Sequence, residues 1–259
     1  MAFWGVYVNM DTAQLLNLVT DIGCELLENG AETYRVEDTM QRIFHAYGYT
    51  DADVFVIPTC MTISITPSHK HSIAKTRRIR CRRTDLNRVD RINGLCREIC
   101  QNPDPPEEVY ERLRVIQNEQ RYSPLMRTAG AALVGFGFTL FYSGTLADAF
   151  CAALIAAIVQ FLANGLERLG SNGIFINIIG GGLIMLMSLI FTQFQLNSLH
   201  LDKIVIGALM ILVPGLALTN SMRDLIAGDY VSGQARLAEA LLTATAIALG
   251  AGVVLSLAR

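Results

Sequence analysis

The 259-residue sequence is 52% hydrophobic and only 17% charged, with a formal net charge of −2 and a mean hydropathy of +0.37. It is too apolar for an ordinary soluble domain and too charged for a pure membrane bundle, and its net charge gives no global argument for nucleic-acid binding. Of the 44 charged residues, 33 precede Thr128. We therefore predict two parts: a cytosolic α+β domain over residues 1–121 and a transmembrane helical domain over residues 122–259.

The N-terminal part begins with residues 1–11, which lack the basic and apolar segments of a secretory signal, so we expect them to stay in the cytoplasm. Apolar side chains then recur at helical spacing over residues 12–29 and 34–47, and Gly30 and Gly48 follow as helix ends. The pattern predicts a helical hairpin. Similar spacing predicts further helices over 85–100 and 107–120.

Between these helices the apolar period changes to two, which predicts three short strands over residues 54–57, 61–65 and 78–82. In the third strand, Ile79 and Cys81 would face a core and three arginines the other side; these are Arg78, Arg80 and Arg82. Such a basic strip fits a solvated strand face, and it also fits contact with membrane phosphates or an acidic partner.

Six cysteines are irregularly spaced, and five of them lie in the part predicted to be cytosolic, so we expect no disulfides. Cys96 and Cys100 are one helical turn apart and could form a metal site with His69 and His71. No CxxC pair supports that reading, and buried thiols are the simpler interpretation. We expect neither a metal nor a cofactor.

The C-terminal part contains apolar segments of the length needed to cross the hydrocarbon core of a bilayer. They predict about five transmembrane helices, over residues 125–142, 146–166, 173–193, 203–222 and 237–257. Thr145 and Asp148 form a capping-box pattern at the start of the second span, so Asp148 is interpreted as a cap. Glycines in the spans are typical of helices that pack closely in lipid.

The basic residues between the spans predict the orientation of the chain. Arg121, Arg127, Arg168, Arg223 and Arg236 fall on one side, and Lys203 and Arg259 on the other. Because cytoplasmic loops are enriched in basic residues, the five-arginine side is predicted to be cytoplasmic. We expect a multi-pass plasma (inner) membrane protein with its N-terminus in the cytoplasm and its C-terminus outside.

The predicted fourth span contains Pro214 and Gly215 near its middle, which indicates a broken helix. A break can be a packing kink, or it can place backbone groups at a substrate site near the midplane. Arg223 and Arg236 follow this break in the sequence, and arginine side chains are suited to the recognition of carboxylates. The candidate substrate path comprises Pro214, Gly215, Thr219, Asn220, Arg223, Asp224, Asp229 and Arg236.

Two segments carry a family resemblance: GAETYRVED at residues 30–38 and PGLALTNSMRDLIAGDYVSG at residues 214–233. On these motifs the chain resembles the threonine/serine exporter (ThrE) family, specifically the split YjjP-like subunit with a cytosolic N-terminal domain. The two motifs lie in different parts of the chain and in the expected order, so the resemblance covers nearly the whole sequence.

The resemblance implies a secondary transporter subunit that exports small amino acids such as threonine and serine, or dicarboxylates such as succinate, without ATP hydrolysis. The sequence likewise has no Walker motif. Fused relatives continue into a second group of spans, whereas this chain stops at Arg259. We therefore expect a second small membrane subunit as partner, possible assembly of identical copies, and no nucleic-acid partner.

The first motif has two interpretations; its residues of interest are Gly30, Glu32, Thr33, Arg35 and Glu37. In the structural one, Gly30 ends a helix, Thr33 caps the next, and Glu32 pairs with Arg35. In the functional one, the three charged residues gate the cytosolic mouth or meet substrate.

Two further function classes remain open. One is a membrane-anchored hydrolase-type enzyme that uses Glu32, Glu37, His45 or Cys60, for which no GxSxG or HExxH motif is present. The other is a sensor or assembly factor that holds a partner through the arginine strip.

Overall fold

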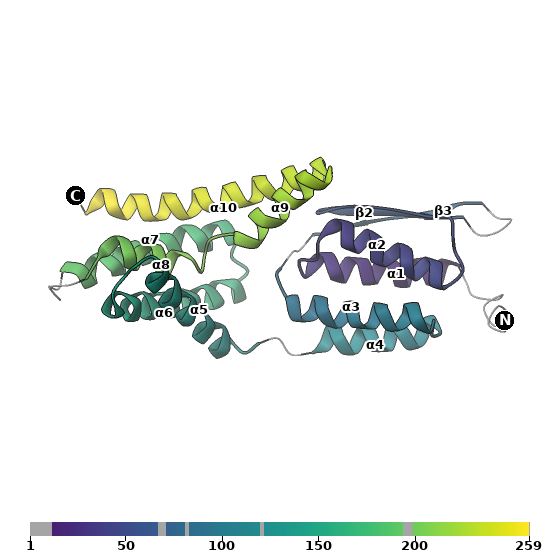
Figure 1. Cartoon of the computed structure of the whole chain (residues 1–259), viewed down its shortest axis with the longest axis horizontal. Coiled ribbons are helices and arrows are strands. Elements are labelled where there is room, and N and C mark those ends of the chain that lie inside the picture. The colour runs from purple at the N-terminus through teal and green to yellow at the C-terminus, as the bar shows by residue number, and fades with distance from the viewer. Residues whose placement is uncertain (1–11, 67–70, 81–82, 120–121, 194–198, 259) are drawn as a thin grey trace. The chain divides into compact units, whose positions relative to one another are not determined.

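The computed structural model describes residues 12–66, 71–80, 83–119, 122–193 and 199–258 (Figure 1). The chain divides into two compact units. The N-terminal unit comprises residues 1–119 together with 228–232, and the C-terminal unit comprises residues 120–227 together with 233–259. The N-terminal segment 1–11 and the residues His69, Cys81, Arg82, Arg121 and Arg259 lie outside the described residues.

The N-terminal unit combines helices with one antiparallel sheet. Its elements in chain order are α1 (Thr12–Glu28), α2 (Thr33–Ala46), β1 (Ala52–Ile57), β2 (Cys60–Ile65), β3 (Ile73–Arg78), α3 (Leu86–Gln101) and α4 (Pro106–Asn118). The strand order is β1-β2-β3, with Val54 opposite Ile63 and Ile63 opposite Lys75. The predicted α+β class is present in this unit, and the four predicted helices are confirmed within two residues at each end.

One hydrophobic core joins all these helices to the inner face of the sheet. Its largest fully buried side chains are Leu15, Leu18, Ile22, Leu26, Leu27, Met40, Ile43, Phe44, Met61, Ile63, Ile65 and Ile92. They follow the helical period on α1 and α2 and the two-residue period on β2. The core therefore lies where the sequence pattern predicts it.

The predicted third strand is wrong in its position. The strand β3 covers residues 73–78, because its pairing with β2 aligns Ile73 with Ile65 and Arg78 with Cys60, so β2 is fully paired when β3 ends. Ile79 is buried as predicted, but it lies after the strand, and its N–H donates to the carbonyl of Thr59 at 2.9 Å.

The basic residues that alternate along the observed strand are Lys75 and Arg77, whereas Arg78 ends the strand and Arg80 follows it. Lys75 donates to the side chain of Asn17 on α1, and Arg77 pairs with Asp21 at 3.0 Å. These residues therefore attach β3 to α1.

The junction between α1 and α2 is only partly as predicted. Gly30 has a positive φ of 95° and ends α1, which confirms its role. The predicted cap at Thr33 is wrong: Thr33 is the first helical residue, its side chain is buried in the core, and Glu32 occupies the cap position without a side-chain cap bond. Arg35 forms no ion pair with the described residues, so the predicted pairing with Glu32 is also absent.

The C-terminal unit consists of helices and the segments that connect them, with no strand among its described residues. Its elements are α5 (Pro124–Phe141), α6 (Leu146–Arg168), α7 (Gly173–Gln193), α8 (Leu201–Leu209), α9 (Gly215–Ala227) and α10 (Tyr230–Leu257). Four of these, α5, α6, α7 and α10, are long and apolar enough to cross a membrane. The predicted fourth span, over residues 203–222, corresponds instead to the two shorter helices α8 and α9. The last helix begins seven residues before the predicted residue 237.

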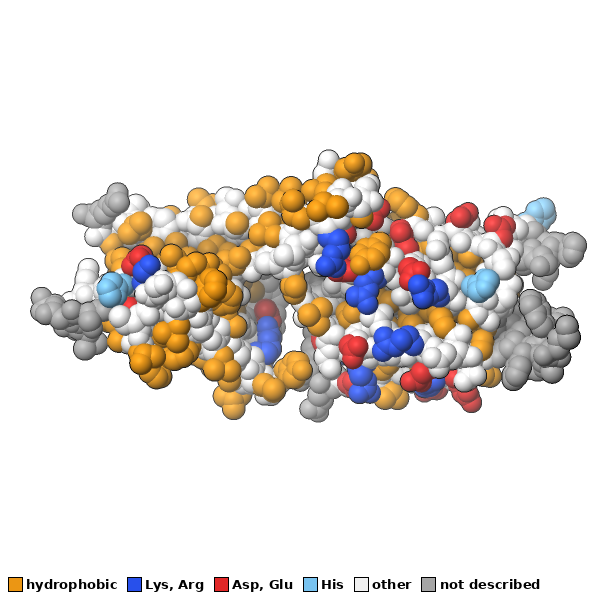
Figure 2. All heavy atoms as spheres, viewed as in Figure 1, with side chains coloured by type: hydrophobic (Ala, Val, Ile, Leu, Met, Phe, Trp, Pro, Cys, Tyr) orange, Lys and Arg blue, Asp and Glu red, His pale blue; other side chains and the backbone are white. Residues whose placement is uncertain are grey.

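The surfaces of the two units differ in composition. In Figure 2 the Lys, Arg, Asp and Glu side chains are concentrated over the N-terminal unit, whereas the visible surface of the C-terminal unit is largely hydrophobic. Large apolar side chains on α5, α6 and α10 are highly exposed, among them Leu125, Leu133, Phe141, Phe161 and Leu257. A lipid environment favours helices of this kind, because their backbone polar groups are hydrogen-bonded within the helix and their outer surface is apolar.

Candidate translocation site in the helical unit

The candidate site is built around the interruption between α8 and α9. The first helix ends at Leu209 and the second begins at Gly215, so the predicted break at Pro214 is present. Pro214 has no backbone N–H and disfavours the helical conformation of the residue before it, which explains why the helix cannot run through. The chain turns there through two hydrogen bonds between residues close in sequence. The N–H of Leu212 donates to the carbonyl of Leu209, and the N–H of Gly215 donates to the carbonyl of Val213.

The first half, α8, is fixed to α5 and α6. Asp148 caps α6: its carboxylate accepts from the N–H and hydroxyl of Thr145, which confirms the predicted capping box. The same carboxylate accepts from the backbone N–H of His200 at 2.8 Å and lies 3.0 Å from its Nδ1, just before α8. Along α8, Gly207 lies so close to Thr139 of α5 that a Cβ would fall 2.9 Å from the Thr139 backbone nitrogen.

The second half, α9, is joined to α10 by a buried ion pair. The carboxylate of Asp224 is fully buried, and the guanidinium of Arg236, whose side chain is 11% exposed, lies 3.2 Å from it. Close approach is possible because Gly233 faces Leu225, where a Cβ would fall within 3.0 Å of the backbone nitrogen. A buried charge in a largely apolar unit needs a compensating partner, and here each charge of the pair compensates the other.

The other predicted path residues lie elsewhere on α9 or in the link that follows it, and residues 228–232 group with the N-terminal unit. Asn220 is half-buried and lies four residues before Asp224, on the same face of α9. Thr219 is exposed, and its hydroxyl donates to the carbonyl oxygens of Gly215 and Leu216 in its own helix. Arg223 is also exposed on α9, and Asp229 lies in the two-residue link between α9 and α10.

Three polar residues of the interrupted helix and its flanking segments were not singled out from the sequence. Ser221 and Ser232 are both buried, and Ser221 donates to the carbonyl of Leu218 in its own helix. His200 was not singled out either, although its backbone N–H donates a hydrogen bond to the carboxylate of Asp148. No sequence signal could have linked His200 to Asp148, because the two are 52 residues apart. For the serines, their position within the second motif was an available signal.

The motif of the N-terminal unit contains residues that stabilise the fold and residues that are exposed at a groove. The Glu37 carboxylate accepts a 2.7 Å hydrogen bond from the N–H of Val56 and so covers the edge strand β1. Burial raises the pKa of Glu37, and the Val56 N–H only partly offsets this. Gly30 and Thr33 belong to the helix junction described above. Arg35 and Asp38 are the exposed charged residues of this motif, and both line a groove between α2 and α3.

No group of three or more His, Cys, Asp or Glu side chains suited to a metal ion occurs within the described part of the chain. The buried ion pair of the candidate site offers one cation and one anion, with the Asn220 amide one helical turn from Asp224. Such a set can bind a small zwitterion or anion through charge-assisted hydrogen bonds.

Together, the apolar helices, the interrupted helix and the buried ion pair define a membrane protein of the transporter class. A comparison with protein families supports this: the model of a family described as "Putative threonine/serine exporter" matches residues 17–258. The chain belongs to this family, and the family is one of exporters, not of enzymes. The hydrolase-type alternative is accordingly wrong.

Two curated relatives have names that agree with the family. The chain is 24% identical over 244 residues to a "Probable threonine/serine exporter" of Mycobacterium tuberculosis, covering 93% of this chain and 46% of that protein. It is 24% identical over 253 residues to a "Threonine/serine exporter" of Corynebacterium glutamicum, covering 95% of this chain and 52% of that protein. The chain thus spans about half the length of these relatives. No solved structure matches it.

Proposed function

We propose that this chain is a subunit of a secondary exporter of small amino acids such as threonine and serine, and that Asp224 and Arg236 contact the substrate. The observation that carries the proposal is the buried ion pair between α10 and α9, the second half of the interrupted helix. The names of the two relatives support the choice of substrate.

An α-amino acid is itself a pair of opposite charges, and this makes it complementary to the Asp224–Arg236 pair. Its carboxylate can replace that of Asp224 on the Arg236 guanidinium, while its ammonium group binds Asp224. The charges of the site then remain balanced with and without substrate, which limits the cost of opening a buried ion pair. Asn220, one turn away on α9, can donate to or accept from a substrate hydroxyl.

Dicarboxylates such as succinate are a second candidate class. A dianion would require two cationic groups, and Arg223 is the second arginine of the motif on α9. Because Arg223 is exposed and Asp224 adds a negative charge to the site, the arrangement favours the zwitterion.

For the topology we propose that α8 and α9 together form a fifth, interrupted crossing of the plasma membrane. Its broken form resembles the discontinuous helices that transporters use at substrate sites. The basic residues at the ends of the helices support a cytosolic N-terminal domain over residues 1–121, a transmembrane domain over residues 122–259, and a C-terminus outside. Fusing a reporter enzyme after Leu257 and before Thr12 tests this arrangement, since the two fusions should report opposite sides.

We further propose a second membrane subunit of the same family as partner. It would correspond to the part of the longer relatives that this chain does not match. The support is the coverage of the relatives, about half of whose length is matched here. Copurification of this chain from its native membrane, followed by mass spectrometry, should recover a small membrane protein of that family; recovery of this chain only with further copies of itself would oppose the proposal.

Export itself is tested in cells that lack this chain and are loaded with labelled threonine, serine or succinate. Restoring the chain should increase efflux of threonine or serine, and Arg236→Gln should reduce it at least tenfold, because a charge-assisted contact with the substrate is lost. Arg168→Gln, an exposed arginine at the end of α6, serves as a matched control and should leave efflux unchanged. Equal efflux with and without the chain would exclude the proposed function.

A further inference from the structure

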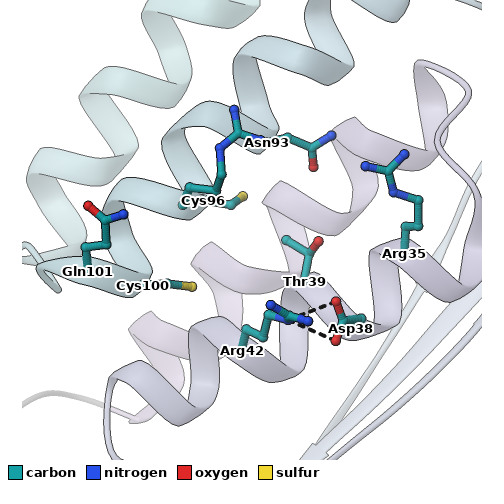
Figure 3. A pocket seen from close by; sticks show the side chains of 9 residues that line it. Arg35, Asp38, Thr39, Arg42, Asn93, Cys96, Cys100 and Gln101 are labelled. Carbon is teal, nitrogen blue, oxygen red and sulfur yellow. Dashed lines mark hydrogen bonds and ion pairs between the residues drawn. The ribbon is translucent and has the colours of Figure 1, made fainter.

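A groove between α2 and α3 of the N-terminal unit has the size and lining of a ligand site. Its volume is about 370 Å³, within the range of sites for small molecules. Figure 3 shows Arg35, Thr39 and the Asp38–Arg42 ion pair on α2, and Asn93 and Gln101 on α3. Arg97 of α3 completes the polar lining. The groove belongs to the N-terminal unit and contains no residue of the proposed transport site.

Two arginines that line this groove from different helices, Arg35 and Arg97, have no carboxylate partner among the described residues. The helices α1–α4 carry seven arginines, all within the described residues. Four of them form ion pairs with carboxylates, and Arg88 donates to the carbonyl oxygens of Gln117 and Glu119. Only Arg35 and Arg97 form no ion pair or hydrogen bond with the described residues, and both line the groove.

The charge of the lining is positive. Three guanidinium groups and the single carboxylate of Asp38 leave two positive charges. The two thiols of the groove add no negative charge at neutral pH, because burial raises the pKa of Cys96 to about 12 and also raises the pKa of Cys100. The neutral side chains between the arginines, Thr39, Asn93 and Gln101, can each donate and accept hydrogen bonds.

We propose that this groove binds a small anion carrying a carboxylate or phosphate group, which Arg35 and Arg97 hold from two sides. Guanidinium groups are suited to both anions, because their planar N–H donors match two oxygens at once. The amide and hydroxyl groups between them recognise further polar atoms of an organic ligand. The site assigns a ligand-binding role to the N-terminal unit that is independent of the exporter's own substrate contacts.

The test is calorimetric titration of the full-length chain in lipid nanodiscs at low ionic strength with three probes: inorganic phosphate, succinate and threonine. We expect saturable binding of at least one probe, and the probe that binds distinguishes a phosphate from a carboxylate ligand. Arg35→Gln and Arg97→Gln should each weaken that binding at least tenfold. Raising the ionic strength should weaken it as well, because the site is open to solvent.

Arg114→Gln is the matched control, because Arg114 is an exposed arginine of the same unit paired with Glu111 outside the groove. It should leave binding unchanged. A second measurement uses the unmodified protein: the bound probe should protect Arg35 and Arg97 from phenylglyoxal, as read by mass spectrometry. The proposal is overturned if no probe binds, or if binding persists in both groove variants and is lost only in Arg236→Gln, which would place the ligand in the helical unit.

Discussion

Asp148 and Asp224 are both fully buried carboxylates of the helical unit, yet they are held in different ways. Asp148 accepts hydrogen bonds from Thr145 and His200 and joins the starts of α6 and α8. Asp224 faces the guanidinium of Arg236 across α9 and α10. A carboxylate held by backbone donors has partners that cannot leave, whereas a side-chain cation can exchange its partner for a ligand. The comparison indicates an architectural role for Asp148, and it agrees with our proposal that Asp224 exchanges Arg236 for a substrate.

Each of the two carboxylates helps to attach one half of the interrupted helix to a neighbouring helix. The half α8 is attached to α5 and α6 through His200 and Gly207, and the half α9 is attached to α10 through Asp224 and Gly233. Residues 210–214, which join the halves, are non-helical. Movement at this link would carry α9 and α10 together, which suits a site that must open alternately to two sides.

The largest expected effect comes from breaking the Asp224–Arg236 pair. Asp224→Asn leaves the buried guanidinium uncompensated and should destabilise the helical unit by about 3–5 kcal/mol. Exchanging the two charges with Asp224→Arg and Arg236→Asp should recover much of this stability, but not export, because the substrate would meet each charge in the wrong place. Thermal unfolding in detergent and labelled-threonine efflux measure the two effects. Restored export in the exchanged variant would contradict substrate contact at this pair.

A smaller effect is expected at Asp148. Replacing it by asparagine weakens the cap of α6 and the contact with His200, and should destabilise the unit by about 1–3 kcal/mol. Export per folded molecule should stay within about twofold of normal. Asp202→Asn, an exposed acidic residue in the first turn of α8, provides the control for thermal unfolding. If Asp148→Asn abolished export without loss of stability, the two carboxylates would not differ in role as inferred here.

Pro214→Ala tests the link between the two halves and should affect rate more than stability. Alanine supplies the missing N–H and the highest helix propensity, so α8 and α9 can join into a more continuous helix. The melting temperature should be unchanged or higher, while efflux should fall several-fold. Leu216→Ala, on the exposed surface of α9, is the comparison variant. Undiminished efflux in Pro214→Ala would show that the break is only a packing kink.

The smallest effect concerns Glu37, a third carboxylate, held by a single backbone N–H. Because burial raises its pKa in the folded state, its ionised form is disfavoured by folding. The stability lost in this way is therefore zero at a pH below the pKa of Glu37 in the unfolded chain. The loss grows as the pH rises and is complete above the pKa of Glu37 in the folded chain. Glu37→Gln keeps an acceptor for Val56 and should change stability by less than about 1 kcal/mol at pH 7. Comparing its unfolding at pH 4 and pH 7 with that of the unmodified chain should show a weaker pH dependence in the variant.

Local patterns in the sequence were sufficient for much of the fold. Helical periods located α1–α4, the length of apolar runs located α5–α7, and Pro214 located the break. The third strand was misplaced because its end depends on pairing with β2, which alternation within the strand itself does not show. Thr33 was taken as a cap because its type and spacing fit, but Thr33 is already the first helical residue and its side chain is buried.

For the candidate site, the sequence by itself determined the residues of the two motifs and the chemistry they offer. Only the tertiary structure decided which residues meet: Asp224 with Arg236 across a tight helix pair, and Asp148 with His200 over 52 residues. It also placed Arg35 and Arg97 in the lining of one groove. The physical reason is that periodicity and capping act within a few residues. Pairing of buried charges depends instead on how whole helices pack, which is set by contacts distant in sequence.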